Sequence, residues 1–418
     1  MFSFPSIHAT TCLRLVPEFR LTDPTATAAA RPSTLLMIAN ISGGHMAMTI
    51  VLPSLPAIAL ALQVRASTAQ LVFTLYVAAF AAAQLVAGPM SDRFGRRPVL
   101  IAGLALFMMS SLVCALTGNI WVLIVARMAQ GAGACTGMVV TRALIRDAYG
   151  EAQTGRSLSY AAMAMGAAPA FAPVIGGYLE IWHGWRAGFW LTTGYATIAF
   201  IATWACLAET RARTSGGGAL GAMIRGYGAL LRTPVFLYYV VIGASLTGAF
   251  FAFISSAPLV FIGVFGVSPD ILSLLIAVLP LGYVLGSFTA ARLMVRLGVV
   301  RLVLLSGVCV VIATTGYLFI SLAGARDPFL LMAPLFVMGI FHGMASPSAL
   351  AGVVSARPDL AGTAAALAGC LQVAFGALVA LAMGTLTYVD QLPTIYVMMA
   401  FALIGLAAAG GVARASRR

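Results

Sequence analysis

Long apolar stretches separated by short polar connections recur along almost the whole chain. Twelve of them approach the roughly 20 residues that a helix needs to cross about 30 Å of hydrocarbon. Because backbone polar groups find no water in a bilayer core, each stretch is expected to be a helix. The pattern predicts an all-α integral membrane protein with twelve transmembrane helices, near residues 35–57, 69–88, 99–117, 120–141, 158–180, 188–208, 235–257, 271–291, 302–323, 330–353, 363–386 and 392–413.

The longest internal connection divides these helices into two groups of six. We predict an N-terminal tail over 1–33, a six-helix bundle over 34–208, a cytoplasmic linker over 209–234, a second six-helix bundle over 235–413 and a short tail over 414–418. The first tail holds four prolines and no apolar stretch of signal-peptide length, which favours a disordered cytoplasmic segment over a cleaved leader. An overlong start of the chain is the alternative.

Composition agrees with a membrane protein. Hydrophobic residues make up 61% of the chain and charged residues only 8%, against about 25% in soluble domains. The net charge is +13, all 24 basic residues are arginines, and most of them lie in short connections. Twenty fall on one predicted side and three, Arg65, Arg186 and Arg326, on the other. This bias predicts a multi-pass protein with both termini in the cytoplasm and explains the charge without a nucleic-acid partner.

The sequence indicates no enzyme, cofactor or metal site. The six cysteines form no CxxC or Cys/His cluster, and five of them fall inside apolar stretches, where cysteine packs as a small side chain. No Ser/His/Asp or Cys/His constellation stands out, so a catalytic function is not expected.

The connection after the second stretch carries the densest charge. Its residues are Gly88, Asp92, Arg93, Gly95, Arg96 and Arg97 within the run 88–97, and a degenerate echo follows the eighth stretch between 286 and 301. The glycines permit a tight turn and close helix approach, and the aspartate can pair with the arginines or cap a helix. The echo is typical of transporters built from parallel repeats.

An arginine stands in the middle of the fourth stretch. A central arginine costs about 2.5 to 3.5 kcal/mol on insertion scales, so Arg127 is expected to face a water-filled cavity or a partner. At about 1.5 Å per residue, Arg127 and Thr49 of the first stretch are predicted to lie at similar depth. His45 lies four residues before Thr49 and shares its helical face.

These segments together resemble the major facilitator superfamily. The loop 88–97 is similar to the superfamily's signature loop, residues 127–133 with Arg127 and Gln130 to its RxxQGxG motif, and residues 172–177 to its GPxxGG antiporter motif, with Ala172 in place of the first glycine. The resemblance implies that the loop 88–97 is a latch that closes the cytoplasmic side in one state. The last motif, with Pro169, Pro173, Gly176 and Gly177, predicts a kinked, close-packed fifth helix.

Four shorter matches, 52–56, 141–147, 184–189 and 255–258, resemble the drug:proton antiporters of the bicyclomycin and chloramphenicol resistance branch (Bcr/CflA). The resemblance implies two six-helix halves, alternating access, and export of small amphipathic drugs across the bacterial inner membrane in exchange for protons. A monomer in the lipid bilayer is the expected state. A metabolite exporter or uptake permease on the same fold, and a non-transporting membrane sensor, are the alternatives.

The chain departs from that branch at Thr49, where its members usually carry an aspartate, and no stretch holds a central Asp or Glu. The titratable candidates for proton coupling are therefore His45 and His342, for which a packing role is the alternative. Side chains predicted to line a central substrate cavity are Tyr76, Gln84, Tyr160, Tyr239, Phe253, Tyr283, Phe341 and Gln372.

Overall fold

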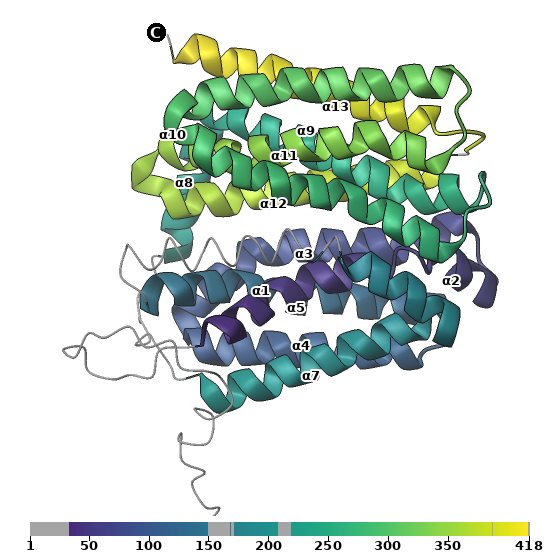
Figure 1. Cartoon of the computed structure of the whole chain (residues 1–418). Helices are drawn as coiled ribbons and strands as arrows, with labels where there is room; N and C mark the ends of the chain where they lie inside the picture. The colour runs from purple at the N-terminus through teal and green to yellow at the C-terminus, as the bar shows by residue number, and fades with distance from the viewer. Residues whose placement is uncertain (1–32, 149–167, 169–170, 208–218, 387, 417–418) are drawn as a thin grey trace, which may run out of the picture.

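The computed structural model describes residues 33–148, 168, 171–207, 219–386 and 388–416, and within these ranges it contains helices and no strand. Figure 1 shows two stacked groups of helices. The first holds α1 (Thr34–Thr49), α2 (Leu55–Ala61), α3 (Ala66–Phe94), α4 (Arg96–Leu116), α5 (Ile120–Ala148), a helix over 171–183 and α7 (Arg186–Cys206). The second holds α8 (Ala219–Leu231), α9 (Pro234–Ala257), η2 (Pro258–Ile262), α10 (Pro269–Leu322), α11 (Pro328–Ala356), η3 (Pro358–Leu360), α12 (Ala361–Thr385) and α13 (Leu392–Ala415).

Nine helices within the described ranges are long and apolar enough to cross a membrane. The longest, α10, has 54 residues and turns back on itself at Gly298, whose φ of 73° suits a glycine. α10 thus makes two passes, as the sequence predicts over 271–291 and 302–323. α1 has only 16 residues and the helix 171–183 adjoins residues outside the described part, so the count of twelve stays a prediction.

The first predicted helix, 35–57, is wrong in its second part. α1 ends at Thr49, the chain turns over residues 50–54, and α2 starts at Leu55. Pro53 has no amide hydrogen to donate to a helix and restricts the residue before it, so the helix stops there. The fourth predicted helix, 120–141, is too short, because α5 continues to Ala148.

Small residues set the distances between helices. A side chain at Gly131 would meet the backbone of α3, and one at Gly133 would lie 2.6 Å from the carbonyl oxygen of Gly103 on α4. The two halves meet where α3 packs on α12: a Cβ at Gly384 would lie 2.6 Å from Gln70. Close backbone approach through glycine is how membrane helices gain packing contact.

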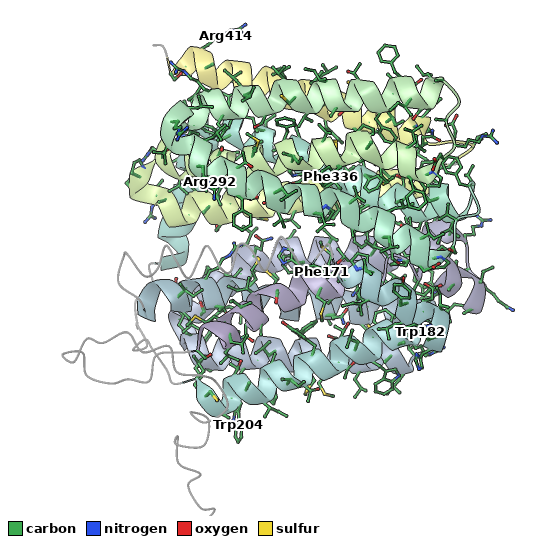
Figure 2. The ribbon with its side chains drawn as sticks, viewed as in Figure 1. Phe171, Trp182, Trp204, Arg292, Phe336 and Arg414 are labelled. Carbon is green, nitrogen blue, oxygen red and sulfur yellow. The ribbon has the colours of Figure 1, made fainter. Side chains whose placement is uncertain are left out.

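The molecule has two distinct ends. α2, the α4–α5 turn and the α10–α11 turn lie at the right in Figure 1, and we call this the α2 end. The C-terminus and α8 lie at the opposite side, which we call the C-terminal end. The labelled arginines Arg292 and Arg414 lie at the C-terminal end, whereas Trp182 lies at the α2 end (Figure 2).

Candidate functional site

Arg127 is completely buried in the middle of the first half. Its Nε donates to the carbonyl oxygen of Val72 on α3 at 3.0 Å, and its Nη1 donates to that of Ala47 on α1 at 3.0 Å and to Oε1 of Gln130. Its guanidinium lies 4.1 Å from the ring centre of Tyr76 and 5.8 Å from that of Phe189. The arginine therefore faces partners from four helices, not a water-filled cavity, in this conformation.

The break after α1 explains one of these bonds. The last helical turn closes with the amide of Ile50 donating to Met46, so the next carbonyl, that of Ala47, is the first without an intrahelical donor. Arg127 supplies that donor. The hydroxyl of Tyr76 donates to the carbonyl of Gly44 at 2.7 Å and ties α3 to the same part of α1. A charged donor on a buried carbonyl is worth more than a neutral one.

Gln130 extends the network to α4. Its Nε2 donates to the hydroxyl of Ser111 at 2.7 Å, and Ser111 donates to the carbonyl of Phe107 at 2.6 Å. Arg127 and Gln130 therefore connect α1, α3, α4 and α5 around one buried charge. Such a network fixes the helices of the first half as one rigid body.

Thr49 and His45 lie beside this network. The hydroxyl of Thr49 donates to the carbonyl of His45 at 3.0 Å, and Thr49 has no exposed surface. Because Ala47 contacts Arg127, Thr49 lies at a depth similar to that of the arginine. His45 packs against the ring of Phe80, 5.9 Å away, and its Nδ1 is buried without a hydrogen-bond partner among the described residues.

His342 lies in the second half, on α11. Its ring makes edge contacts with Tyr283, 5.6 Å away, and Phe250, 6.4 Å away. The hydroxyl of Tyr283 lies 3.4 Å from that of Ser346. The structure thus brings His342 and Tyr283 together, with Phe341 half-buried next to the histidine.

The other predicted cavity residues are spread over several places. Gln84 on α3 faces Gly369 of α12 across the contact between the halves. Tyr239 and Gln372 fill the spaces beside Gly352 and Gly243 inside the second half, and Phe253 is buried there. Tyr160 and Pro169 lie outside the described residues. Only Gln84, Tyr283, Phe341 and His342 thus stand as candidates for a shared central site.

One functional candidate escaped the sequence analysis. Arg142 lies in α5 and its side chain is exposed, yet it interacts electrostatically with His45 of the first half and Tyr283 of the second. Arg142 therefore lies among residues of both halves. The sequence predicts no role for Arg142, because the predicted fourth helix ends at residue 141, whereas α5 continues past it to Ala148.

The charged segment 88–97, predicted as a loop, forms the last two turns of α3, Gly95 and the start of α4, so the predicted second helix, 69–88, is too short. Gly95 ends α3 with φ 98° and also precedes α4. Asp92 pairs with Arg96 at 2.7 Å, and Arg96, itself buried, donates to Ser91 at 2.6 Å. Arg93 stacks on its neighbour Phe94, and Gly88 has only Val139 near its Cβ position.

Arg97 connects the charged segment 88–97 to the end of α7. It donates to the carbonyls of Leu207 and Trp204 at 2.6 and 2.8 Å. These carbonyls lie at the end of α7, where intrahelical donors are missing, and Trp204 lies at the C-terminal end of the molecule (Figure 2). These hydrogen bonds hold the segment 88–97 against α7 of the first half.

The helix over 171–183 closes the α2 end. Pro173 is buried, a Cβ at Gly176 would overlap the carbonyl oxygen of Ile50, and a Cβ at Gly177 would overlap Ser273 of α10. Gly177 therefore lets the helix 171–183 of the first half pack directly against Ser273 and the backbone of Pro269 in the second. No group of His, Cys, Asp and Glu that could hold a metal occurs among the described residues.

Comparison with known proteins agrees with this architecture. Residues 38–381 match the model of the Major Facilitator Superfamily. The chain is 32% identical to multidrug resistance protein D of Escherichia coli over 81% of this chain and 84% of that protein, and 30% identical to a chloramphenicol resistance protein of Pseudomonas aeruginosa over 78% and 77%. A D-xylose-proton symporter crystal structure shares the fold, with a TM-score of 0.72 at 14% identity over 90% of this chain and 96% of the symporter. The chain belongs to the major facilitator superfamily.

Proposed function

We propose that the protein exports small amphipathic drugs across the bacterial inner membrane by alternating access, in exchange for protons, and acts as a monomer. The observation that carries this proposal is the similarity, over about four fifths of the chain, to proteins named for multidrug and chloramphenicol resistance. The two halves, joined by glycine contacts between α3 and α12 and between helix 171–183 and α10, supply the surfaces that alternating access separates and rejoins.

The charges near the centre favour neutral substrates over cations. Arg127 and Arg142 are positive, and no predicted span holds a central carboxylate that would attract a cation. The side chains available to a substrate, Tyr283, Phe341 and Gln84, offer aromatic surface and hydrogen bonds instead. Phenicol-like and bicyclomycin-like compounds fit this chemistry better than lipophilic cations.

Expression in an efflux-deficient bacterial host tests the proposal. Growth is measured against a panel of neutral antibiotics and lipophilic cations, with an empty-vector strain as control. Raised resistance to neutral compounds is expected. Unchanged resistance to every compound would instead favour a metabolite carrier. Thr49 also favours such a carrier, because drug:proton antiporters of the Bcr/CflA branch usually have a carboxylate at this position. Substrate flux in vesicles separates such a carrier from a sensor.

The orientation can be tested with cysteine reporters. Twenty arginines fall on the predicted side of both termini and three on the other, so we expect the C-terminal end in the cytoplasm and the α2 end outside. In a cysteine-free background, Gly118→Cys in the α4–α5 turn and Gly228→Cys on α8 form a matched pair, since neither position has an atom within 4 Å of its Cβ. An impermeant thiol reagent applied to intact cells is expected to label position 118 only. Labelling of position 228 instead would reverse the orientation.

Proton coupling is proposed to use two histidines, the half-buried His45 and the buried His342. His45 lies beside Thr49, where the branch has its aspartate, and His342 lies beside Tyr283 in the other half. An imidazole that water reaches in one state can bind and release a proton near neutral pH. His45→Gln is expected to abolish proton-driven export while downhill substrate exchange continues, and His342→Gln is the matched variant. Dissipation of an imposed pH gradient on adding substrate to inverted vesicles measures the coupling. Parent-like dissipation by both variants would exclude the histidines.

A further inference from the structure

A partly buried carboxylate lies at the α2 end. Glu180 belongs to the helix 171–183, its Oε2 is buried, and that oxygen has no hydrogen-bond partner among the described residues. The hydroxyl of Ser54 hydrogen-bonds to the same carboxylate. Ser54 is itself only 4% exposed and lies in the turn between α1 and α2. The carboxylate thus has one hydrogen-bond partner, Ser54, while its buried Oε2 has no donor among the described residues.

Glu180 lies on the surface that closes the two halves together. Gly177 precedes it by three residues, which places both on one helical face. At Gly177 the helix touches Ser273 and lies close to the carbonyl of Pro269, both at the start of α10 in the second half. α2 also contacts η2 across the halves. Glu180 therefore lies one helical turn from the contact between the halves, which must separate when the α2 end opens.

The closed junction disfavours an ionised Glu180. A buried charged oxygen without a donor costs far more than a neutral carboxyl group in the same place. When the junction opens, water solvates the carboxylate and that cost disappears. The closed state therefore binds the proton more tightly than the open state, and proton binding must in turn stabilise closure to the same extent.

Few other charges act on this junction. At this end of the molecule, the titratable or charged residues on the neighbouring elements are Arg65, Tyr178, His183, Arg186 and Asp270; residues 50–62 and 258–268 contain none. Arg186 donates to the carbonyl of Thr117 and stacks on Trp185, so its charge has other partners. Asp270 has the same sign as an ionised Glu180 and therefore cannot stabilise it.

We infer that Glu180, held by Ser54, is a proton-binding site that locks the α2 end closed when protonated and releases it when ionised. The proton comes from the water on that side of the membrane and returns there on opening, so the site controls the gate and is separate from the coupling histidines. The inference rests on the proposed alternating access, but it concerns a conformational equilibrium that needs no substrate.

The experiment measures the gate directly. Spin labels are attached to Ala61→Cys at the end of α2 and Val264→Cys after η2, two exposed positions on opposite halves, in an otherwise cysteine-free protein in lipid nanodiscs. Distances are recorded by electron paramagnetic resonance at about pH 5 and about pH 9, which bracket the titration of a partly buried glutamate. The parent is expected to shift from a short to a long distance as pH rises, and Glu180→Gln to keep the short distance throughout.

Two controls and a second variant make the result specific. His183→Gln and Asp270→Asn are expected to keep the parent's pH response, because neither group is the switch. Ser54→Ala removes a donor to the ionised form and is expected to move the transition to higher pH by about one unit. A pH response of Glu180→Gln like the parent's, or no response in the parent, would overturn the inference. Because no drug is present, loss of export would not affect this outcome.

Discussion

Replacing Arg127 with lysine is expected to abolish transport and to lower the thermal stability of the protein in detergent. Lysine keeps the positive charge but cannot reach Val72, Ala47 and Gln130 at once, as the planar guanidinium does. Two buried acceptors and a buried charge then lose partners, at a cost of about 3 kcal/mol. Drug resistance in cells and thermal unfolding of the purified variant measure the two effects.

Arg186→Lys is the matched control. Arg186 also donates to a carbonyl, that of Thr117, and also stacks on an aromatic ring, but it is only half-buried at the α2 end. Its replacement is expected to cost less than about 1 kcal/mol, because water can replace the lost contacts. Equal losses of transport and thermal stability in the two variants would show that the buried contacts of Arg127 matter no more than those of a half-buried arginine.

The second large effect is expected from Gly177→Ala. A methyl group there would overlap Ser273 and approach the carbonyl of Pro269, which as backbone cannot move aside alone. The α2 end then cannot close, and transport is expected to fall by at least about tenfold, equivalent to about 1.4 kcal/mol of lost closure. Transport rates and the label distance between positions 61 and 264 report the loss and its cause.

Gly194→Ala gives the comparison for this glycine. Gly194 lies on α7 and no atom lies within 4 Å of its Cβ position, so the methyl group meets open space and transport is expected to stay at the parent's level. If Gly177→Ala closes and transports like the parent, the contact between helix 171–183 and α10 is not part of the transport cycle.

Much of the fold could be predicted because the bilayer imposes it. Apolar length predicts most of the helices, and the turn between α3 and α4 falls at Gly95, inside the predicted connection 88–97, with the positive φ that a glycine permits. The break after α1 was missed because apolar residues continue across it. A proline alone does not predict such a break, because membrane helices often tolerate proline.

The candidate site was less predictable, because its contacts join distant parts of the chain. Arg127 was expected to need a partner, but nothing in the sequence showed that the partner is the carbonyl of Ala47, eighty residues away. Glu180 counted as a carboxylate at a helix end, and its buried oxygen is visible only once the helix 171–183 is packed against α1 and α10. Arg142 had no predicted role, because its electrostatic contacts with His45 and Tyr283 join distant parts of the chain.

Proton-coupled export by a single chain is tested most directly in proteoliposomes that contain only the purified protein and an internal pH-sensitive dye. A pH gradient is imposed, and once the internal pH is steady a neutral phenicol antibiotic is added. The pH gradient is expected to drive the antibiotic against its concentration gradient and to dissipate faster when the antibiotic is present. Antibiotic movement that leaves the gradient unchanged would show an uncoupled carrier, and no movement of the antibiotic would contradict export itself.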